Sequence, residues 1–324
     1  MEQDLAQRLL SGDRRALSRL ITLVERHDAR VPELLQSLHH RTGRAYRIGV
    51  TGPPGSGKST LVDSLVVNLR QQQRSVGILA VDPTSPYTGG AVLGDRIRMQ
   101  RHYLDRDVFI RSMATRGSLG GVAKTLRWAA QVLDAAGKDV VLVETVGIGQ
   151  ADVDVTNVAD TVVVVLVPES GDAIQVMKAG LMEIADIFVV NKADREGAQE
   201  VVAALKAMLS MGEQVTDWMV PVIATQANAG IGVADLHASI QGHREFLESS
   251  SQLEVRRRRQ RRQAFLQSVE DALHARLSRL LQETGKLAEV AQAVERGEED
   301  PLAAAHHLLN SGALSHLFQP PPPE

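Results

Sequence analysis

The chain contains no cysteine among its 324 residues. This absence excludes disulfide bonds, thiolate metal sites and thiol catalysis, and it fits a reducing compartment. Long hydrophobic runs are absent as well, because the longest, Val162–Val167, has the length of a strand and is far too short to span a bilayer. The first residues carry early acidic side chains and no apolar core of a signal peptide. These absences together predict a cytoplasmic protein.

The sequence also lacks a strong excess of charge of one sign, since its formal net charge is −3. Bulk electrostatics therefore predict no nucleic-acid partner and no membrane partner. The local exception is the run RRRRQRR at Arg256–Arg262, which no aromatic residues interrupt. A nucleic-acid surface usually combines basic with aromatic side chains, so we interpret this run as a solvated helix face.

The order of apolar patterns indicates an α/β fold with a helical extension on each side. Residues 1–45 have apolar side chains at helical spacing, and Asp13 is placed to cap a second helix after Gly12. Unbroken Val- and Ile-rich runs then alternate with amphipathic segments, which predicts a doubly wound, mostly parallel sheet buried on both faces. The expected strands are Arg47–Thr51, Ser75–Val81, Val108–Met113, Val140–Val143, Thr161–Val167, Ile187–Val190 and Val220–Ala224.

After about Gly242 no further strand is expected. Arg244–Glu283 has one long helical pattern, and its apolar stripe is either a coiled-coil seam or a face packed on the domain. We expect an N-terminal helical extension over 1–45, a P-loop domain over 46–242, a C-terminal helical or dimerisation extension over 243–318, and a loose proline-rich tail over 319–324.

The segment GPPGSGKS, which begins at Gly52, fits G-x-x-x-x-G-K-[ST] at every fixed position. It lies between an expected strand and an expected helix, which is the arrangement of a phosphate-binding P-loop. Glycines let backbone N–H groups surround phosphate oxygens, and the helix N-terminus adds its positive dipole end. Lys58 is expected to reach the β- and γ-phosphates and Ser59 to ligate Mg²⁺. The expected phosphate-binding residues are Gly52, Pro54, Gly55, Ser56, Gly57, Lys58, Ser59 and Thr60.

A second motif, Asn191-Lys192-Ala193-Asp194, follows an expected strand and indicates guanine. The Asp194 carboxylate can accept hydrogen bonds from two guanine donors, and adenine has no equivalent pair. Asn191 is expected to contact the base edge and join the loops, while the Lys192 stem covers the ring. Gln226 and Ala227, after the last expected strand, are candidates for the remaining base contact.

Acidic side chains at strand ends complete the expected site. Glu144 and Gly147 form E-x-x-G where a Walker-B acid belongs, with Glu144 on Mg²⁺ or its water and the Gly147 N–H on the γ-phosphate. Asp82 ends another strand and can orient water or hold Mg²⁺ water, and Asp95 is a further Mg²⁺ candidate. We expect Lys58, Asp82, Glu144 and Gly147 to act in catalysis. No glutamine follows Gly147 directly, so we expect slow intrinsic hydrolysis that a partner accelerates.

These stretches together resemble the SIMIBI-class G-proteins of the MeaB/ArgK group, GTPase chaperones of methylmalonyl-CoA mutase, over about residues 5–245. The resemblance rests on segments such as GVTGPPGSGKSTLVDSL, VDPTSPYTGGAVLGDRIRM, VETVGIGQ and GDAIQVMKAGLMEIADIFVVNKAD. It implies a GTP- and Mg²⁺-binding homodimer that couples GTP hydrolysis to cofactor loading and protection of an adenosylcobalamin-dependent acyl-CoA mutase. It implies Mg²⁺ or catalytic roles for Asp82, Asp95 and Glu144, and it makes Asp172 and Lys178 candidates for a switch that senses the mutase. We expect no cobalamin on this chain itself.

Three other functions fit the sequence less well. A nickel-inserting metallochaperone GTPase needs a Cys or His cluster, and this chain has no Cys and ten scattered His. A GTP- or ATP-dependent kinase linked to amino-acid transport gives no reason for the guanine motif. A targeting GTPase of the signal-recognition type needs a methionine-rich helix, and no Met follows Gly242.

Overall fold

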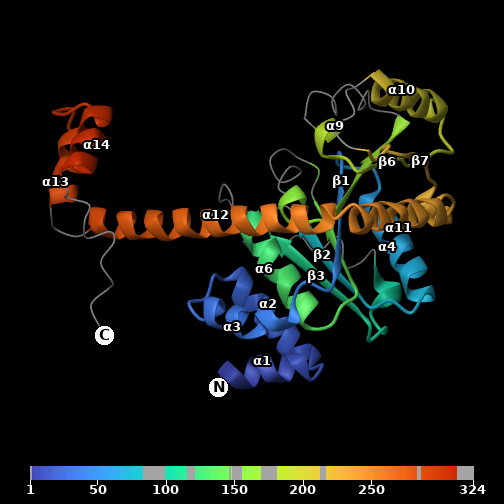
Figure 1. Ribbon diagram of the computed structural model, residues 1–324, viewed down its shortest axis with the longest axis horizontal. Coiled ribbons are helices and arrows are strands. Elements are labelled where there is room, and N and C mark those ends of the chain that lie inside the picture. Colours follow the sequence, from blue (N-terminus) through green and yellow to red (C-terminus); the bar gives the residue numbers. More distant parts are fainter. Residues whose placement is uncertain are drawn as a thin grey trace. The chain divides into compact units, whose positions relative to one another are not determined.

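The computed structural model describes residues 2–82, 99–114, 121–145, 147, 155–168, 181–211, 217–282 and 286–311. Its residues divide into two compact units, 1–258 and 259–324, and the boundary falls within one helix. The first unit contains a seven-stranded sheet with its covering helices (Figure 1). In the second unit, α13 (Lys286–Glu295) packs against α14 (Pro301–Asn310).

All seven strands are parallel, in the order β3-β2-β4-β1-β5-β6-β7. The strands are β1 (Tyr46–Thr51), β2 (Val76–Asp82), β3 (Val108–Ala114), β4 (Val140–Glu144), β5 (Thr161–Leu166), β6 (Ile187–Val190) and β7 (Val222–Ala224). Every residue of β4, β5 and β6 is buried, which explains why their sequences are continuously apolar rather than alternating. The prediction of a doubly wound parallel sheet is confirmed.

Helices cover both faces of this sheet in the first unit. One face packs on α4 (Lys58–Gln71) and α11 (Val233–Ser249), and the other on α6 (Gly121–Ala135) and α10 (Ala198–Met211). The N-terminal helices α1 (Glu2–Leu10), α2 (Arg14–Glu25) and α3 (Val31–Leu38) form a further layer, in which α2 and α3 contact α6. The expected cap is confirmed, because the Asp13 carboxylate accepts hydrogen bonds from Arg15 N and Ala16 N at the start of α2.

The remaining elements are short. They are the 3₁₀ turns η1 (His39–Arg41), η2 (Gln100–His102), η3 (Val155–Asn157) and η5 (Ala227–Ala229) and the one-turn helix α9 (Leu181–Ile184). Within the described ranges, no helix has both the length and the apolar character that a bilayer crossing requires.

The single helix expected over Arg244–Glu283 is wrong. Two helices replace it, α11 and α12 (Gln252–Gln282), and the break lies at Ser250 and Ser251. Ser251 has a φ of 59°, outside the helical region, and the Ser250 hydroxyl donates to the Phe246 carbonyl. Serine hydroxyls compete for backbone acceptors in this way, so a run of serines ends a helix that the apolar pattern alone would continue.

The interpretation of Arg256–Arg262 as a solvated face is wrong for its first two members. Arg256 donates to the Asp186 carboxylate at 2.7 and 2.9 Å, and Arg257 donates to the Asp160 carboxylate at 2.9 and 2.7 Å. Asp160 is fully buried, and it lies directly before β5 as Asp186 lies before β6. The expectation failed because the acidic partners are about 70 to 97 positions away in the sequence.

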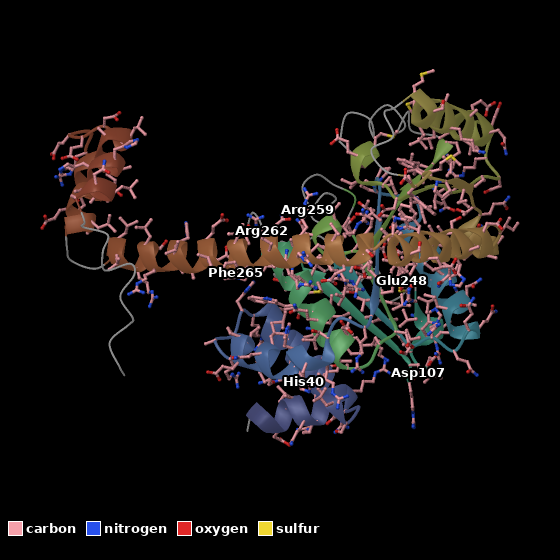
Figure 2. The ribbon with its side chains drawn as sticks, viewed as in Figure 1. His40, Asp107, Glu248, Arg259, Arg262 and Phe265 are labelled. Atoms are coloured by element: carbon pink, nitrogen blue, oxygen red, sulfur yellow. The ribbon has the colours of Figure 1, made fainter. Side chains whose placement is uncertain are left out.

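The rest of the run matches the solvated interpretation more closely. Arg258, Arg259, Arg261 and Arg262 are exposed, and Figure 2 shows the Arg259, Arg262 and Phe265 side chains projecting from α12. The apolar stripe that continues along α12 is also exposed in the single chain at Leu266, Val269 and Leu273.

Candidate nucleotide-binding site

The P-loop follows β1 and requires glycine at two positions. Gly52 has a φ of 133°, and a Cβ there would lie 2.1 Å from the Val165 carbonyl oxygen. Gly57 has a φ of 86°, and a Cβ there would lie 2.4 Å from Nδ2 of Asn191. Both positions combine a left-handed backbone with close packing, so a side chain at either one would displace the loop.

Lys58 begins α4 and is buried inside the loop rather than extended into solvent. Its Nζ donates to the Gly52 carbonyl at 2.8 Å and to the Pro53 carbonyl at 3.0 Å. The loop therefore curls around an ammonium group at the N-terminus of a 14-residue helix, where the helix dipole favours anions. The buried Ser56 hydroxyl in the same loop has no hydrogen-bond partner among the described residues.

A buried hydroxyl and a buried carboxylate meet beside the loop. Parallel pairing of Val50 with Glu144 places the end of β4 next to the start of the P-loop. The Ser59 Oγ donates to Oε1 of Glu144 at 2.6 Å, and both residues are less than 7% exposed. Hydroxyl and carboxylate oxygens are the ligand types that Mg²⁺ prefers.

Gly147 lies against the same loop. It has a φ of 86°, and a Cβ there would lie 1.9 Å from the Gly52 carbonyl oxygen and 2.9 Å from Nζ of Lys58. Gly147 therefore lies next to Lys58, and only a glycine fits at this position of the predicted E-x-x-G motif.

The Asn191 side chain joins three loops. Its Nδ2 donates to the Ser56 carbonyl of the P-loop at 2.8 Å. Its Oδ1 accepts from the Thr225 hydroxyl and from the Ala227 N–H, both at 3.1 Å. Asn191 is 3% exposed, so these contacts lie in the interior. Asn191, which we expected to join the loops, therefore makes three hydrogen bonds: one to the P-loop and two to the loop after β7.

The rest of the second motif lies at the surface of this junction. The Ala193 N–H donates to the Thr225 carbonyl at 2.9 Å, which fixes the motif against the loop after β7. Lys192 has a φ of 56°, uncommon outside glycine, and Asp194 is exposed. Gln226 pairs with Ile231 through two backbone hydrogen bonds, so the expected third base loop is a closed turn.

Comparison with known proteins identifies the family of this chain. Residues 17–281 match the family described as methylmalonyl Co-A mutase-associated GTPase MeaB. The chain belongs to this family. The match extends beyond the region of about 5–245 over which the motifs showed the resemblance, and includes α11 and most of α12.

Similarity to individual proteins supports the membership of this chain in the MeaB family. The chain is 48% identical to a putative GTPase of Pyrococcus abyssi, over 97% of this chain and 99% of that protein. It is 35% identical to the GTPase ArgK of Escherichia coli, over 78% and 79%, and 34% identical to the mouse mitochondrial protein named methylmalonic aciduria type A homolog, over 78% and 65%. A crystal structure titled LAO/AO transport system kinase is similar in fold, with a TM-score of 0.70 and 26% identity over 95% of this chain and 96% of that one. The chain is a MeaB-family GTPase.

Several predicted residues of this MeaB-family site lie outside the described residues. These are Asp95, Asp172 and Lys178, and for Asp82 only the backbone, at the end of β2, is described. Pro54 is exposed on the P-loop, and Thr60 is half-buried in the first turn of α4. Within the described ranges, no group of three or more His, Asp or Glu side chains is placed to hold a metal ion.

Two groups of polar contacts near the candidate site were not predicted from the sequence. The Thr145 hydroxyl donates to the Thr51 hydroxyl at 2.8 Å, and both residues are buried where β4 and β1 end. Thr225 supports Asn191, as described above. The positions of Thr51, Thr145 and Thr225 in the sequence could have indicated these contacts. Each residue carries a hydroxyl group and lies at the carboxyl end of an apolar strand, and doubly wound sheets bind ligands at that edge.

Proposed function

We propose that this protein binds and hydrolyses GTP as a chaperone of an adenosylcobalamin-dependent acyl-CoA mutase of the methylmalonyl-CoA mutase type. In this role it gates cofactor loading and protects the mutase from inactivation. The chain holds GTP or GDP with Mg²⁺, and the mutase rather than the chaperone carries the cobalamin. We place the protein in the cytoplasm, with no nucleic-acid or membrane partner.

The observation that carries the nucleotide assignment is the junction at Asn191. A phosphate-binding loop and a guanine-type motif can occur separately by chance in a long sequence. Here one buried side chain bonds to the P-loop at Ser56 and to the loop after β7 at Thr225 and Ala227. The phosphate end and the base end of one nucleotide site would thereby be held at a fixed separation. Asp194, which is exposed beside this junction, is available to read the guanine donors.

The residues around the P-loop suit phosphate chemistry. Ser59 and Glu144 supply an oxygen donor set for Mg²⁺, which when bound would neutralise phosphate charge. Lys58, now bonded to two loop carbonyls, would turn to the β- and γ-phosphates, and the remaining P-loop residues would donate backbone N–H groups. Gly147 would meet the γ-phosphate, and Asp82 and Asp95 would complete the water and Mg²⁺ shell. We expect slow hydrolysis because no glutamine follows Gly147 directly.

The mutase assignment rests on family membership. The family is described by its association with methylmalonyl-CoA mutase, and a mouse relative has a name that refers to methylmalonic aciduria. We propose Asp172 and Lys178 as part of the switch that senses the mutase. We further propose the domain boundaries 1–45, 46–242 and 243–318 and a homodimer, for which the exposed Leu266, Val269 and Leu273 offer an apolar surface.

The first test is nucleotide turnover by the purified protein, alone and with an adenosylcobalamin-dependent acyl-CoA mutase from the same source. Phosphate release is measured with GTP and, in parallel, with ATP. We expect a slow rate with GTP alone that rises strongly with the mutase. A rate that every such mutase leaves unchanged would remove the chaperone assignment and keep the GTPase, whereas equal phosphate release from ATP would contradict the guanine assignment.

Two variants test the residue assignments. Lys58→Ala is expected to abolish GTP binding or turnover, and Lys206→Ala, an exposed lysine on α10, serves as its control. Asp194→Asn is expected to shift base preference from guanine toward xanthine, because the amide donates where xanthine accepts. Glu33→Gln, an exposed carboxylate on α3, makes the same chemical change elsewhere. Unchanged GTP affinity in both site variants would refute the assignment.

A further inference from the structure

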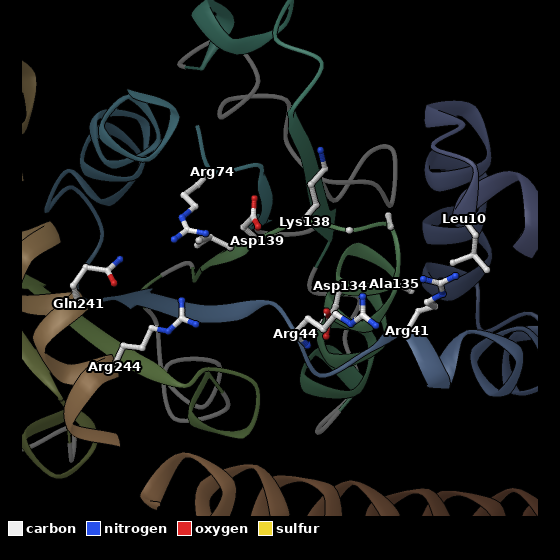
Figure 3. Close-up of a pocket in the computed structure, with 13 residues that line it drawn as sticks. Leu10, Arg41, Arg44, Arg74, Asp134, Ala135, Lys138, Asp139, Gln241 and Arg244 are labelled. Atoms are coloured by element: carbon white, nitrogen blue, oxygen red, sulfur yellow. Dashed lines mark hydrogen bonds between the residues drawn. The ribbon is translucent and has the colours of Figure 1, made fainter. Parts of the chain in front are cut away.

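A cavity lies at the opposite edge of the sheet from the P-loop. Its volume is about 410 Å³, and its lining includes Val140, the first residue of β4, with residues that precede β1 and β2 (Figure 3). In a parallel sheet all strands begin at one edge and end at the other, so this cavity is separate from the site at the carboxyl ends. The volume is within the range of small-molecule sites, roughly 300–1,000 Å³.

Five cationic side chains line this cavity, although the whole chain has a net charge of −3. They come from four separate stretches of the chain: the residues from η1 to β1, the α4–β2 connection, the α6–β4 connection and α11. The five are Arg41, Arg44, Arg74, Lys138 and Arg244. No sequence run brings them together, so only the fold collects this charge.

Two carboxylates line the cavity, and both are already used by the backbone. The Asp134 carboxylate accepts from the N–H groups of Gly43, Arg44 and Ala45 at 2.6, 3.2 and 2.9 Å. The Asp139 carboxylate accepts from the N–H and the hydroxyl of Ser75 at 2.7 and 2.8 Å. Five cations and two carboxylates leave a formal charge of +3, and the carboxylates act as structural acceptors.

Three of the guanidinium groups form no hydrogen bond among the described residues, although Arg74 also attracts the Asp139 carboxylate. Among the described residues, no side chain or carbonyl accepts a hydrogen bond from the guanidinium of Arg41, Arg44 or Arg74, and all three residues are exposed. Figure 3 shows Arg44 near Asp134 and Arg74 near Asp139. Lys138 and Arg244 are already engaged, since Lys138 donates to the Asp107 carbonyl and Arg244 to the Glu248 carboxylate. Their charges still add to the field of the cavity.

The segment that carries Arg44 is held in place on two sides. Its N–H groups bond to Asp134, and the Gly43 and Ala45 carbonyls accept from Arg257 at 2.7 and 2.8 Å. A fixed backbone reduces the entropy that a ligand contact must overcome. This position is therefore prepared for binding rather than formed by it.

We propose that this cavity is a binding site for a small molecule that carries at least two phosphate groups. The planar guanidinium presents paired donors that match phosphate oxygens, and three such groups in one cavity suit more than one phosphate. The volume exceeds what a single phosphate ion fills and suits a ligand the size of a mononucleotide. The proposal depends on the cavity alone and stands whether or not a mutase is the partner.

The test measures binding of adenosine 3′,5′-bisphosphate by calorimetry to the full chain carrying Lys58→Ala, with Mg²⁺ and without any other nucleotide. This background removes binding at the P-loop and leaves no free diphosphate to compete at the cavity. Adenosine is the uncharged control ligand. We expect one saturable site that weakens as salt is raised, and no binding of adenosine.

Removal of the charges of Arg41, Arg44 and Arg74 tests whether the ligand binds in this cavity. The triple variant Arg41→Gln, Arg44→Gln, Arg74→Gln is expected to bind at least about tenfold more weakly, since each charge-assisted hydrogen bond contributes that order of affinity. The control triple variant Arg15→Gln, Arg19→Gln, Arg26→Gln removes the same charge from exposed arginines in or just after α2, outside the cavity. Circular dichroism verifies that both variants fold. Absence of saturable binding, or an equal loss in both triple variants, would overturn the proposal.

Discussion

Replacement of Asn191 by alanine tests the idea that one side chain holds the nucleotide site together. The variant removes three hydrogen bonds, to the Ser56 carbonyl, the Thr225 hydroxyl and the Ala227 N–H. Each bond contributes roughly 1 kcal/mol net, and buried groups left without partners cost more. We therefore expect Asn191→Ala to lower the free energy of unfolding by about 3 kcal/mol, a large part of a typical total of about 5–15 kcal/mol.

Urea unfolding followed by tryptophan fluorescence is the suitable assay. Both tryptophans of the chain, Trp128 and Trp218, lie in the first unit, so the signal reports the unit that contains the site. The dependence on urea should keep its slope, so that a shifted midpoint measures stability rather than a change in the denatured state. Asn228→Ala is the matched control, because Asn228 is exposed in η5 and its replacement should change stability by no more than about 0.5 kcal/mol.

A second replacement separates shape from hydrogen bonding. Asn191→Asp keeps the size of the side chain but turns the Nδ2 donor into an oxygen that faces the Ser56 carbonyl. Two acceptors then meet in the interior, so we expect a loss of stability at least as large as that of Asn191→Ala. A loss below about 1 kcal/mol in both variants would refute the view that this side chain holds the loops in place.

Two further predictions concern the contacts that α12 and α11 make with the sheet. Asp160→Asn should lower the free energy of unfolding by about 3–5 kcal/mol in the same urea assay, because it leaves the half-buried Arg257 without its partner charge. Asp235→Asn, at an exposed position, is the control and should have little effect. Equal losses of stability in the two variants would contradict the prediction. His243→Gln should flatten the dependence of stability on acid pH. Burial lowers the pKa of His243 to about 4, against about 6.5 unfolded, so the unfolded chain binds the proton first. Stability is then complete above about pH 6.5 and falls by about 3 kcal/mol toward pH 4, and an unchanged slope in the variant would contradict the assignment.

Much of the nucleotide site was predictable because its determinants are local. The P-loop requires glycine where the backbone is left-handed, and Gly52 and Gly57 meet that requirement at fixed spacing from Lys58. The motif at Asn191 follows a strand that the run Ile187–Val190 already indicates. Strand positions were predictable for the same reason, since a parallel strand buried on both faces is apolar at every residue.

Other features depend on partners that are distant along the chain. The pairing of Arg256 with Asp186 was invisible in the sequence, where the arginine is one of several in an exposed-looking run. The helix breaks at Ser251 because serine hydroxyl groups compete with backbone N–H groups for carbonyl acceptors. The spacing of apolar residues does not reveal this competition. The contact between Ser59 and Glu144 required the pairing of β1 with β4, although both residues were candidates by motif.

Residue type and spacing along the chain were enough to predict most of the strands, the family, and where phosphate and guanine contacts are expected. Each of these depends on residue type and spacing within a few dozen positions. Folding was needed to show that Asn191 bonds to two loops, that Arg257 anchors α12 on Asp160, and that five cations from four stretches of the chain surround one cavity. The physical reason is that hydrogen bonds and charges act between neighbours in space, and strand order sets those neighbours.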